Sequence, residues 1–172
     1  MDWNVYVVER ERRQCYLSPL PHEVVFDHGL PSQAVAGEVF GEVVQRATTN
    51  DPGEIKPEQF AQNSAFVQFL HASLARHAPH CPGVLQEAAR QRDGWVYIID
   101  GRSPDPQGTV PPEDVIGKLE VVDGRVTGQY AGSKRHRILG SHGLMQLDPW
   151  LEERFMQDLH RLCGRAPHLG AT

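Results

Sequence analysis

The densest group of metal-ligating side chains follows a helical pattern, where His77, His80 and Cys81 fall close together. Zinc takes imidazole nitrogen and thiolate sulfur as ligands, and a chain leaving a helix can fold such neighbours onto one ion. His71 precedes His77 by roughly 600° of helix rotation and therefore points away from it. Because the sequence has no Cys-x2-Cys or His-Glu-x-x-His pattern, we expect a polar helix end here and keep zinc as the alternative.

A proline-rich, acidic segment at 101–114 is the second candidate site. It joins two strand patterns, although hairpin loops usually have only about two to five residues. Its prolines restrict the unfolded chain, which favours a stiff connection with or without a partner. We predict that it is a contact surface for another protein, and the side chains assigned to that surface are Arg102, Asp105, Gln107, Glu113 and Asp114.

The acids of the same segment offer a second chemistry. Asp100, Asp105, Glu113 and Asp114 carry the oxygen ligands that magnesium and calcium prefer. Their spacing differs from that of a calcium-binding loop. Metal binding here is therefore the alternative to a protein contact.

A third candidate combines glycines at 128–132 with the cations Lys134, Arg135 and Arg137. Its composition is that of a phosphate loop, but the glycine spacing differs and no helix pattern follows. We expect a solvated turn at a strand edge, with an anion or RNA contact through these cations as the alternative.

The neighbours Asp27 and His28 could orient a base, but no Gly-x-Ser-x-Gly elbow accompanies them.

Charge and composition exclude several classes of protein. The 172 residues carry a net charge of −5, which repels phosphate backbones and argues against nucleic acid as a partner. Cys15, Cys81 and Cys163 are odd in number and far apart, which indicates free thiols in a reducing compartment. The sequence has neither a secretory leader nor an apolar run of about 20 residues, so we expect a cytoplasmic protein without a membrane partner.

Strand patterns occur in both halves of the chain. Residues 3–8 and 14–17 predict a hairpin, and 34–45 fits a strand better than a helix because glycines interrupt it. Trp95–Ile99 is apolar on both faces, which predicts a central strand covered on both sides. Asp123-Gly124 prefers positive φ and predicts a tight hairpin between the strand patterns on either side of it.

Three helices are predicted. The longest runs from about 57 to 77, because Pro57 suits a first turn and prolines follow the end. A short helix covers 84–91. The last runs from about 148 to 163, because Asp148 is a good N-cap and is followed by a proline.

This order of elements lacks the regular alternation of a doubly wound parallel sheet. We therefore predict an α+β fold, in which the long helix and the C-terminal helix pack on an antiparallel or mixed sheet. Residues 1–164 are expected to form a single domain, followed by a flexible tail at 165–172.

The function favoured by the sequence is a small interaction module of the adaptor, inhibitor or immunity type, which binds another protein through 101–114. A metal- or histidine-dependent enzyme, such as a hydrolase, is the first alternative. Anion or RNA binding through 132–137 is the second. The sequence leaves a homo-oligomer open.

Overall fold

The computed structural model describes residues 6–9, 15–21, 24–25, 39–44 and 55–163. The chain divides into two compact units, one made of Met1–Leu70 with Glu153–Thr172 and the other of His71–Glu152. The divisions fall within helices α2 (Ser64–His77) and α4 (Pro149–Leu162), so each helix contributes to both units. Each unit is described below by itself, and the expected single domain of 1–164 stays a prediction.

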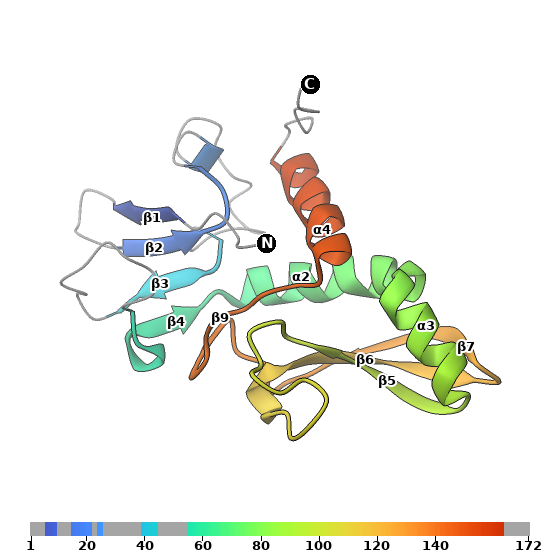
Figure 1. Cartoon of the computed structure of the whole chain (residues 1–172). Coiled ribbons are helices and arrows are strands. Elements are labelled where there is room, and N and C mark those ends of the chain that lie inside the picture. Colours follow the sequence, from blue (N-terminus) through green and yellow to red (C-terminus); the bar gives the residue numbers. More distant parts are fainter. Residues whose placement is uncertain (1–5, 10–14, 22–23, 26–38, 45–54, 164–172) are drawn as a thin grey trace, which may run out of the picture. The chain divides into compact units, whose positions relative to one another are not determined.

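The first unit contains an antiparallel sheet of four short strands in the order β1-β2-β3-β4 (Figure 1). β1 (Tyr6–Glu9) and β2 (Cys15–Ser18) form the predicted hairpin, with Val7 opposite Leu17. β3 (Gly41–Val43) confirms a strand within the ambiguous stretch 34–45, of which 34–38 and 45 lie outside the described residues. β4 (Phe60–Gln62) completes the sheet.

Gly41 shows why a glycine stands in this sheet. A Cβ atom at this position would lie 2.2 Å from the carbonyl oxygen of Ala61 on β4. A larger residue would therefore push the paired strands apart. A glycine inside a strand commonly marks a place where another backbone comes this close.

Aromatic rings hold the core of the first unit. The ring of Phe66 on α2 meets Phe40 edge-on at 4.9 Å and Phe155 on α4 edge-on at 5.6 Å, both between ring centroids. Leu70 on α2 and Leu159 on α4 are buried as well. Edge-to-face contacts of this kind stabilise a core beyond the area that the rings bury.

The long helix begins later than the pattern from Pro57 predicts. Residues Pro57–Gln59 form a 3-10 turn, η2, and β4 follows before α2 starts at Ser64. Asn63 sets this start, because its Oδ1 accepts a hydrogen bond from Ala65 N while its Nδ2 donates to Val39 O, each at 3.0 Å. The helical pattern gave no sign that residues 60–62 would pair with β3 in a sheet.

The second unit contains an antiparallel sheet in the order β5-β6-β7. Its strands are β5 (Gly94–Ile99), β6 (Val115–Val122) and β7 (Arg125–Gly132). Asp123 and Gly124 connect β6 to β7 with φ of 51° and 75°, so the predicted hairpin is confirmed.

The prediction that Trp95–Ile99 forms a central strand is wrong. Among the described strands, β5 pairs with β6 alone and lies at the edge of the sheet. Val96 and Ile98 are buried, whereas Tyr97 is 54% exposed. The other face carries Trp95, Tyr97 and Ile99, which are also large and apolar. A half-exposed strand therefore has the composition that is typical of a fully buried one.

Helices and a short hairpin complete the second unit. α3 (Pro82–Gln91) follows the 3-10 turn η3 (Ala78–His80) and contacts β5 and β7. After β7, the two short strands β8 (Leu139–Gly140) and β9 (Gly143–Leu144) pair with each other. Asp148 caps α4 as predicted, since its Oδ1 accepts a hydrogen bond from Trp150 N at 2.9 Å.

The α+β class is therefore confirmed, with antiparallel strands distributed over three sheets in the described part of the chain. No helix among the described residues is long and apolar enough to cross a membrane.

Candidate functional site

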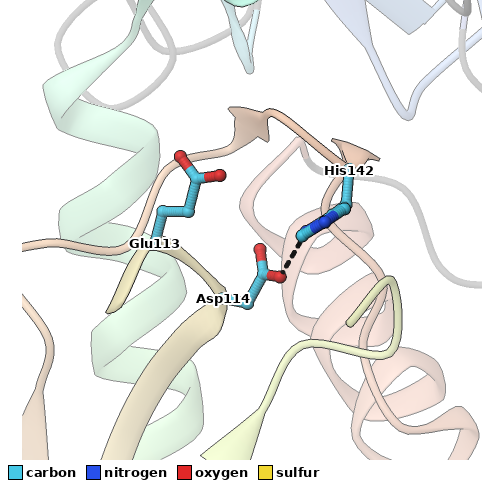
Figure 2. Close-up of side chains that lie close together, drawn as sticks. All are labelled: Glu113, Asp114 and His142. Carbon is cyan, nitrogen blue, oxygen red and sulfur yellow. Dashed lines mark hydrogen bonds and ion pairs between the residues drawn. The ribbon is translucent and has the colours of Figure 1, made fainter. Parts of the chain in front are cut away.

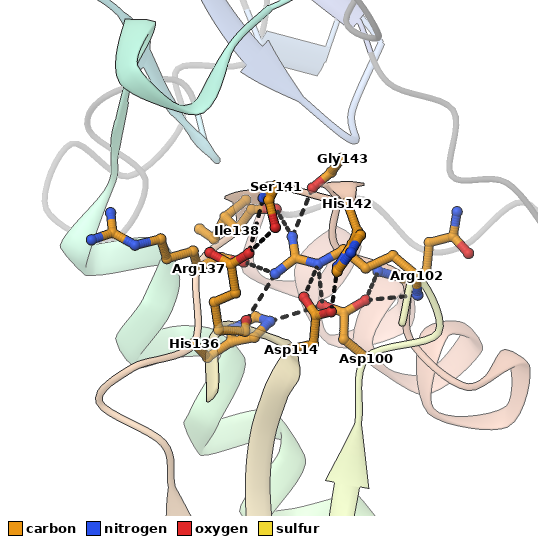
Figure 3. A network of polar contacts seen from close by, with 11 residues as sticks. Asp100, Arg102, Asp114, His136, Arg137, Ile138, Ser141, His142 and Gly143 are labelled. Carbon is orange, nitrogen blue, oxygen red and sulfur yellow. Dashed lines mark hydrogen bonds and ion pairs between the residues drawn. The ribbon is translucent and has the colours of Figure 1, made fainter. Parts of the chain in front are cut away.

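Arg102 lies at the centre of the most extensive polar network in the second unit (Figure 3). The side chain is buried, and a guanidinium group has five N–H donors. All five are used, over distances of 2.7–3.0 Å. The acceptors are one carboxylate oxygen, of Asp114, and the main-chain carbonyls of Glu113, Arg137, Ile138 and Gly143. Arg102 thus joins the two ends of segment 101–114 to the β8–β9 hairpin.

Asp100 supports Arg102 from the other side. Its Oδ1 accepts hydrogen bonds from the main-chain N–H groups of Arg102 and Gln146, at 3.1 and 2.8 Å. Its Oδ2 accepts a hydrogen bond from His136 Nε2 at 2.9 Å and lies 3.5 Å from Arg102 Nε. A fully buried carboxylate is stable only when its oxygens are paired in this way.

Asp114 and Glu113 extend the network to the surface. Asp114 is fully buried, and its Oδ2 accepts a hydrogen bond from His142 Nδ1 at 2.9 Å. The Glu113 carboxylate accepts hydrogen bonds from the hydroxyl and the main-chain N–H of Ser141. These two bonds hold the pKa of Glu113 below its ordinary value.

Three side chains at this end of the network lie close enough together to share a metal ion (Figure 2). One ligand atom each from Glu113, Asp114 and His142 can be chosen so that all three lie within 4.8 Å of one another. Two carboxylates and one imidazole are donors for a divalent cation such as zinc.

The predicted zinc ligands His77, His80 and Cys81 do not form such a group. Within the part of the chain that the structure describes, the Glu113, Asp114 and His142 cluster alone meets the distance limit. The Cys81 thiol is buried and lies 3.9 Å from Asp148 Oδ1, and burial raises its pKa. Asp27 and His28 lie outside the described residues.

The predicted contact surface at 101–114 is wrong for two of its five side chains. Arg102 is only 9% exposed and Asp114 is fully buried, because both belong to the ionic network. Asp105 and Gln107 are exposed, as is the whole stretch 104–109, and Glu113 is half-buried. The segment thus has two anchored ends and an exposed middle.

A groove of about 560 Å³ runs between this exposed middle, α3 and β5. The segment contributes Pro106–Gly108 and Val110, and α3 contributes Gly83, Glu87 and Gln91. Strand β5 contributes residues from both of its faces, namely Trp95, Val96, Tyr97 and Ile99. Because both faces are represented, the groove follows the open edge of the sheet.

A smaller hollow of about 210 Å³ adjoins the groove on the sheet itself. The two share Tyr97 and Val115. Gly117 and Ala131 provide a shallow floor, and Lys118 borders it while its Nζ lies 4.1 Å from the centre of the Trp95 ring. Tyr97 therefore separates a long groove from a side pocket.

The third set of candidates lies in the turn after β7. The side chains of Lys134, Arg135 and Arg137 are exposed, and Arg137 uses its main-chain carbonyl to bind Arg102. An anion site at these cations stays a prediction.

Sequence reasoning missed His136, Ser141 and His142 as partners of the acids in 100–114. Each lies 28 to 36 positions from its partner, so no local spacing connects them. The high number of histidines, nine in 172 residues, was the one available signal. Comparison with family models, curated proteins and solved structures finds no match to this chain.

Proposed function

We propose that this chain is a protein-interaction module that binds an extended segment of another protein along the open edge of β5. The groove between β5, α3 and 106–110 is the observation that carries the proposal. Extended peptides commonly bind by adding a strand to a sheet edge, where main-chain hydrogen bonds give affinity and side pockets give specificity.

The main-chain groups of β5 support this binding mode. Trp95 O accepts a hydrogen bond from the side chain of Gln91, so this carbonyl faces α3 and not β6. Because alternate residues of a strand direct their N–H and C=O groups to the same side, the main chain of Tyr97 faces the groove as well. These groups are a template for an incoming strand.

The side chains along the groove support recognition of an apolar segment. Tyr97 is 54% exposed, and it stands between the groove and the side pocket above Gly117 and Ala131. An exposed aromatic side chain beside a pocket is typical of the residues that carry binding energy. We expect a bound strand to place apolar side chains against Tyr97 and in the side pocket.

The anchored ends of 101–114 complete the proposal. Arg102 and Asp114 fix both ends of the segment, and Gly108 N donates to Asp105 O within the exposed middle at 3.2 Å. A wall that is ordered before binding loses less entropy when a partner arrives. The segment then acts as one side of the groove instead of as a separate contact loop.

The test is selection of short random peptides on the full-length chain, followed by affinity measurements with the selected peptides. The key variant is Tyr97→Pro, which removes a main-chain donor from the edge that faces the groove. Proline is tolerated on an edge strand when its missing N–H faces away from the sheet. The matched control is Gln129→Pro on β7, at the opposite edge of the same sheet, where the main-chain N–H donates to Thr127 Oγ1 of the same strand at 3.3 Å.

We expect Tyr97→Pro to abolish peptide binding and Gln129→Pro to preserve it, with both variants retaining a cooperative thermal transition. If Tyr97→Pro unfolds the chain, Tyr97→Asp takes its place. A carboxylate at this position should oppose binding of an apolar segment, so loss of peptide binding is again the expected result. Selection that yields no binder, or binding that survives both Tyr97 substitutions, would contradict the proposal.

The finer expectations from the sequence belong to the same proposal. We place the protein in the cytoplasm, where its three cysteines would stay reduced. Binding of RNA through Lys134, Arg135 and Arg137 is a separate alternative, and retention on heparin at low salt would favour it.

A further inference from the structure

We propose that Glu113, Asp114 and His142 form a binding site for one divalent metal ion, with zinc as the preferred ion. The inference is independent of peptide binding at β5. It rests on the donor set, on the charge of the surrounding network and on the way the ligands are held.

The three donors come from two separate segments of the chain. Glu113 and Asp114 belong to the 3-10 turn η4 (Pro112–Asp114), and His142 lies in the turn between β8 and β9. Figure 2 shows the imidazole pointing toward the Asp114 carboxylate from the right, with the Glu113 carboxylate to the left of both. An imidazole in the set favours zinc over magnesium and calcium, which prefer oxygen ligands alone.

The charge of the network favours an added cation. The carboxylates of Asp100 and Asp114 form ion pairs with the single guanidinium of Arg102, and the Glu113 carboxylate lies beside the same guanidinium at Gly140. Asp100 and Asp114 are both fully buried, and buried charge is costly unless it is balanced. Three carboxylates against one guanidinium leave an excess of negative charge before the histidines are counted, and a divalent ion at Asp114 and His142 would compensate it.

The distance between the Asp114 and His142 ligand atoms fits zinc after a small adjustment. Bonds of about 2.0–2.1 Å in a tetrahedral site place neighbouring ligand atoms about 3.3 Å apart. Asp114 Oδ2 and His142 Nδ1 are 2.9 Å apart, so they must separate by a few tenths of an ångström. The His142 side chain is 35% exposed, which leaves it room to move and leaves a fourth position for water.

Two neighbours hold the carboxylates in place for this role. Arg102 Nε binds Asp114 Oδ1 at 2.8 Å, and Oδ2 becomes available when the metal replaces the proton that His142 Nδ1 shares with it. Ser141 binds Oε1 of Glu113, which leaves Oε2. Outer partners of this kind orient metal ligands and strengthen binding.

The test is calorimetric titration of the metal-free, full-length chain with zinc chloride, and separately with magnesium and calcium chloride. We expect one zinc ion per chain and weaker or absent binding of the other two. His142→Gln and Glu113→Gln should each weaken zinc binding by about tenfold or more. His80→Gln removes an exposed histidine of the other candidate group and should leave the affinity unchanged.

A spectroscopic readout keeps the proposal testable if a ligand variant fails to fold. Cobalt in the wild-type site should give visible absorption without a thiolate charge-transfer band, because no cysteine belongs to the set. No zinc binding by the wild type, a thiolate band, or loss of affinity in His80→Gln but not in His142→Gln would overturn the assignment.

Discussion

The ends and the middle of segment 100–114 have the same polar, proline-rich composition and opposite environments. At the ends, Asp100, Arg102 and Asp114 are buried and bonded to one another. In the middle, 104–109 is exposed and lines a groove through Pro106–Gly108. The difference shows that one long polar loop can anchor the fold at its ends while its middle stays exposed and lines a groove, and we expect mutation to separate the two parts.

The largest effect on stability is expected from removing the positive charge of Arg102 at the centre of the network. Arg102→Met deletes five hydrogen bonds and leaves Asp100 and Asp114 buried without their cation. Loss of one partner from a buried ion pair costs about 3–5 kcal/mol, so we expect a loss of that size in the free energy of unfolding. Urea denaturation measures it. Arg135→Met, at an exposed position, is the control, and an equal loss in both variants would refute the anchor role.

A smaller loss is expected at Asp100. The substitution Asp100→Asn keeps the shape but removes the charge that faces His136 and Arg102. Weakening these bonds should cost about 1–3 kcal/mol in chemical denaturation. Asp105→Asn changes an exposed acid of the same segment and should cost little. An equal change in the free energy of unfolding in the two variants would contradict the difference between the ends and the middle of the segment.

The pH dependence of stability sharpens the comparison further. Because Ser141 lowers the pKa of Glu113, its stabilising contribution is complete above the ordinary value of 4.5 and is lost as the pH falls through the lowered folded-state pKa. Burial lowers the pKa of His71 below its ordinary value of 6.5. The free energy of unfolding therefore also falls as the pH drops from 6.5 toward the lowered pKa of this histidine. We therefore expect Glu113→Gln to flatten the decline only below about pH 4.5, as measured by thermal denaturation across the acid range. A slope unchanged by the substitution would contradict this prediction.

The smallest effects are expected in the middle of the segment. Asp105→Ala and Gln107→Ala alter exposed side chains and should change the free energy of unfolding by no more than about 0.5 kcal/mol. Gln107→Ala should still weaken peptide binding, since Gln107 lines the groove and Asp105 does not. A large stability loss in either variant would mean that the middle is also an anchor.

The elements that depend on local chemistry could be predicted from the sequence. The Asp123-Gly124 pair readily adopts the positive φ angles of a tight hairpin, and Asp148 is a favourable N-cap residue. The β6–β7 hairpin and the start of α4 therefore appear where expected. The start of α2 was not predictable in this way. Pairing of β4 with β3, about twenty residues earlier in the chain, overrides the helical pattern from Pro57.

The candidate site was predictable only in part. The length of 101–114 drew attention to this region, and Glu113 and Asp114 were among the acids proposed for a metal. The role of Arg102 was missed, because its acceptors lie 11 to 41 positions along the chain. A buried arginine and an exposed one have the same local sequence signature, and only the fold distinguishes them.

The most direct test replaces 105–109 with glycine and serine at constant length, so that Arg102 and Asp114 keep their positions. Thermal stability and affinity for a peptide selected on the wild type are then measured on one preparation. The separation of anchor and wall predicts a melting temperature close to that of the wild type together with loss of the peptide. Unchanged affinity, or collapse of the fold, would contradict it.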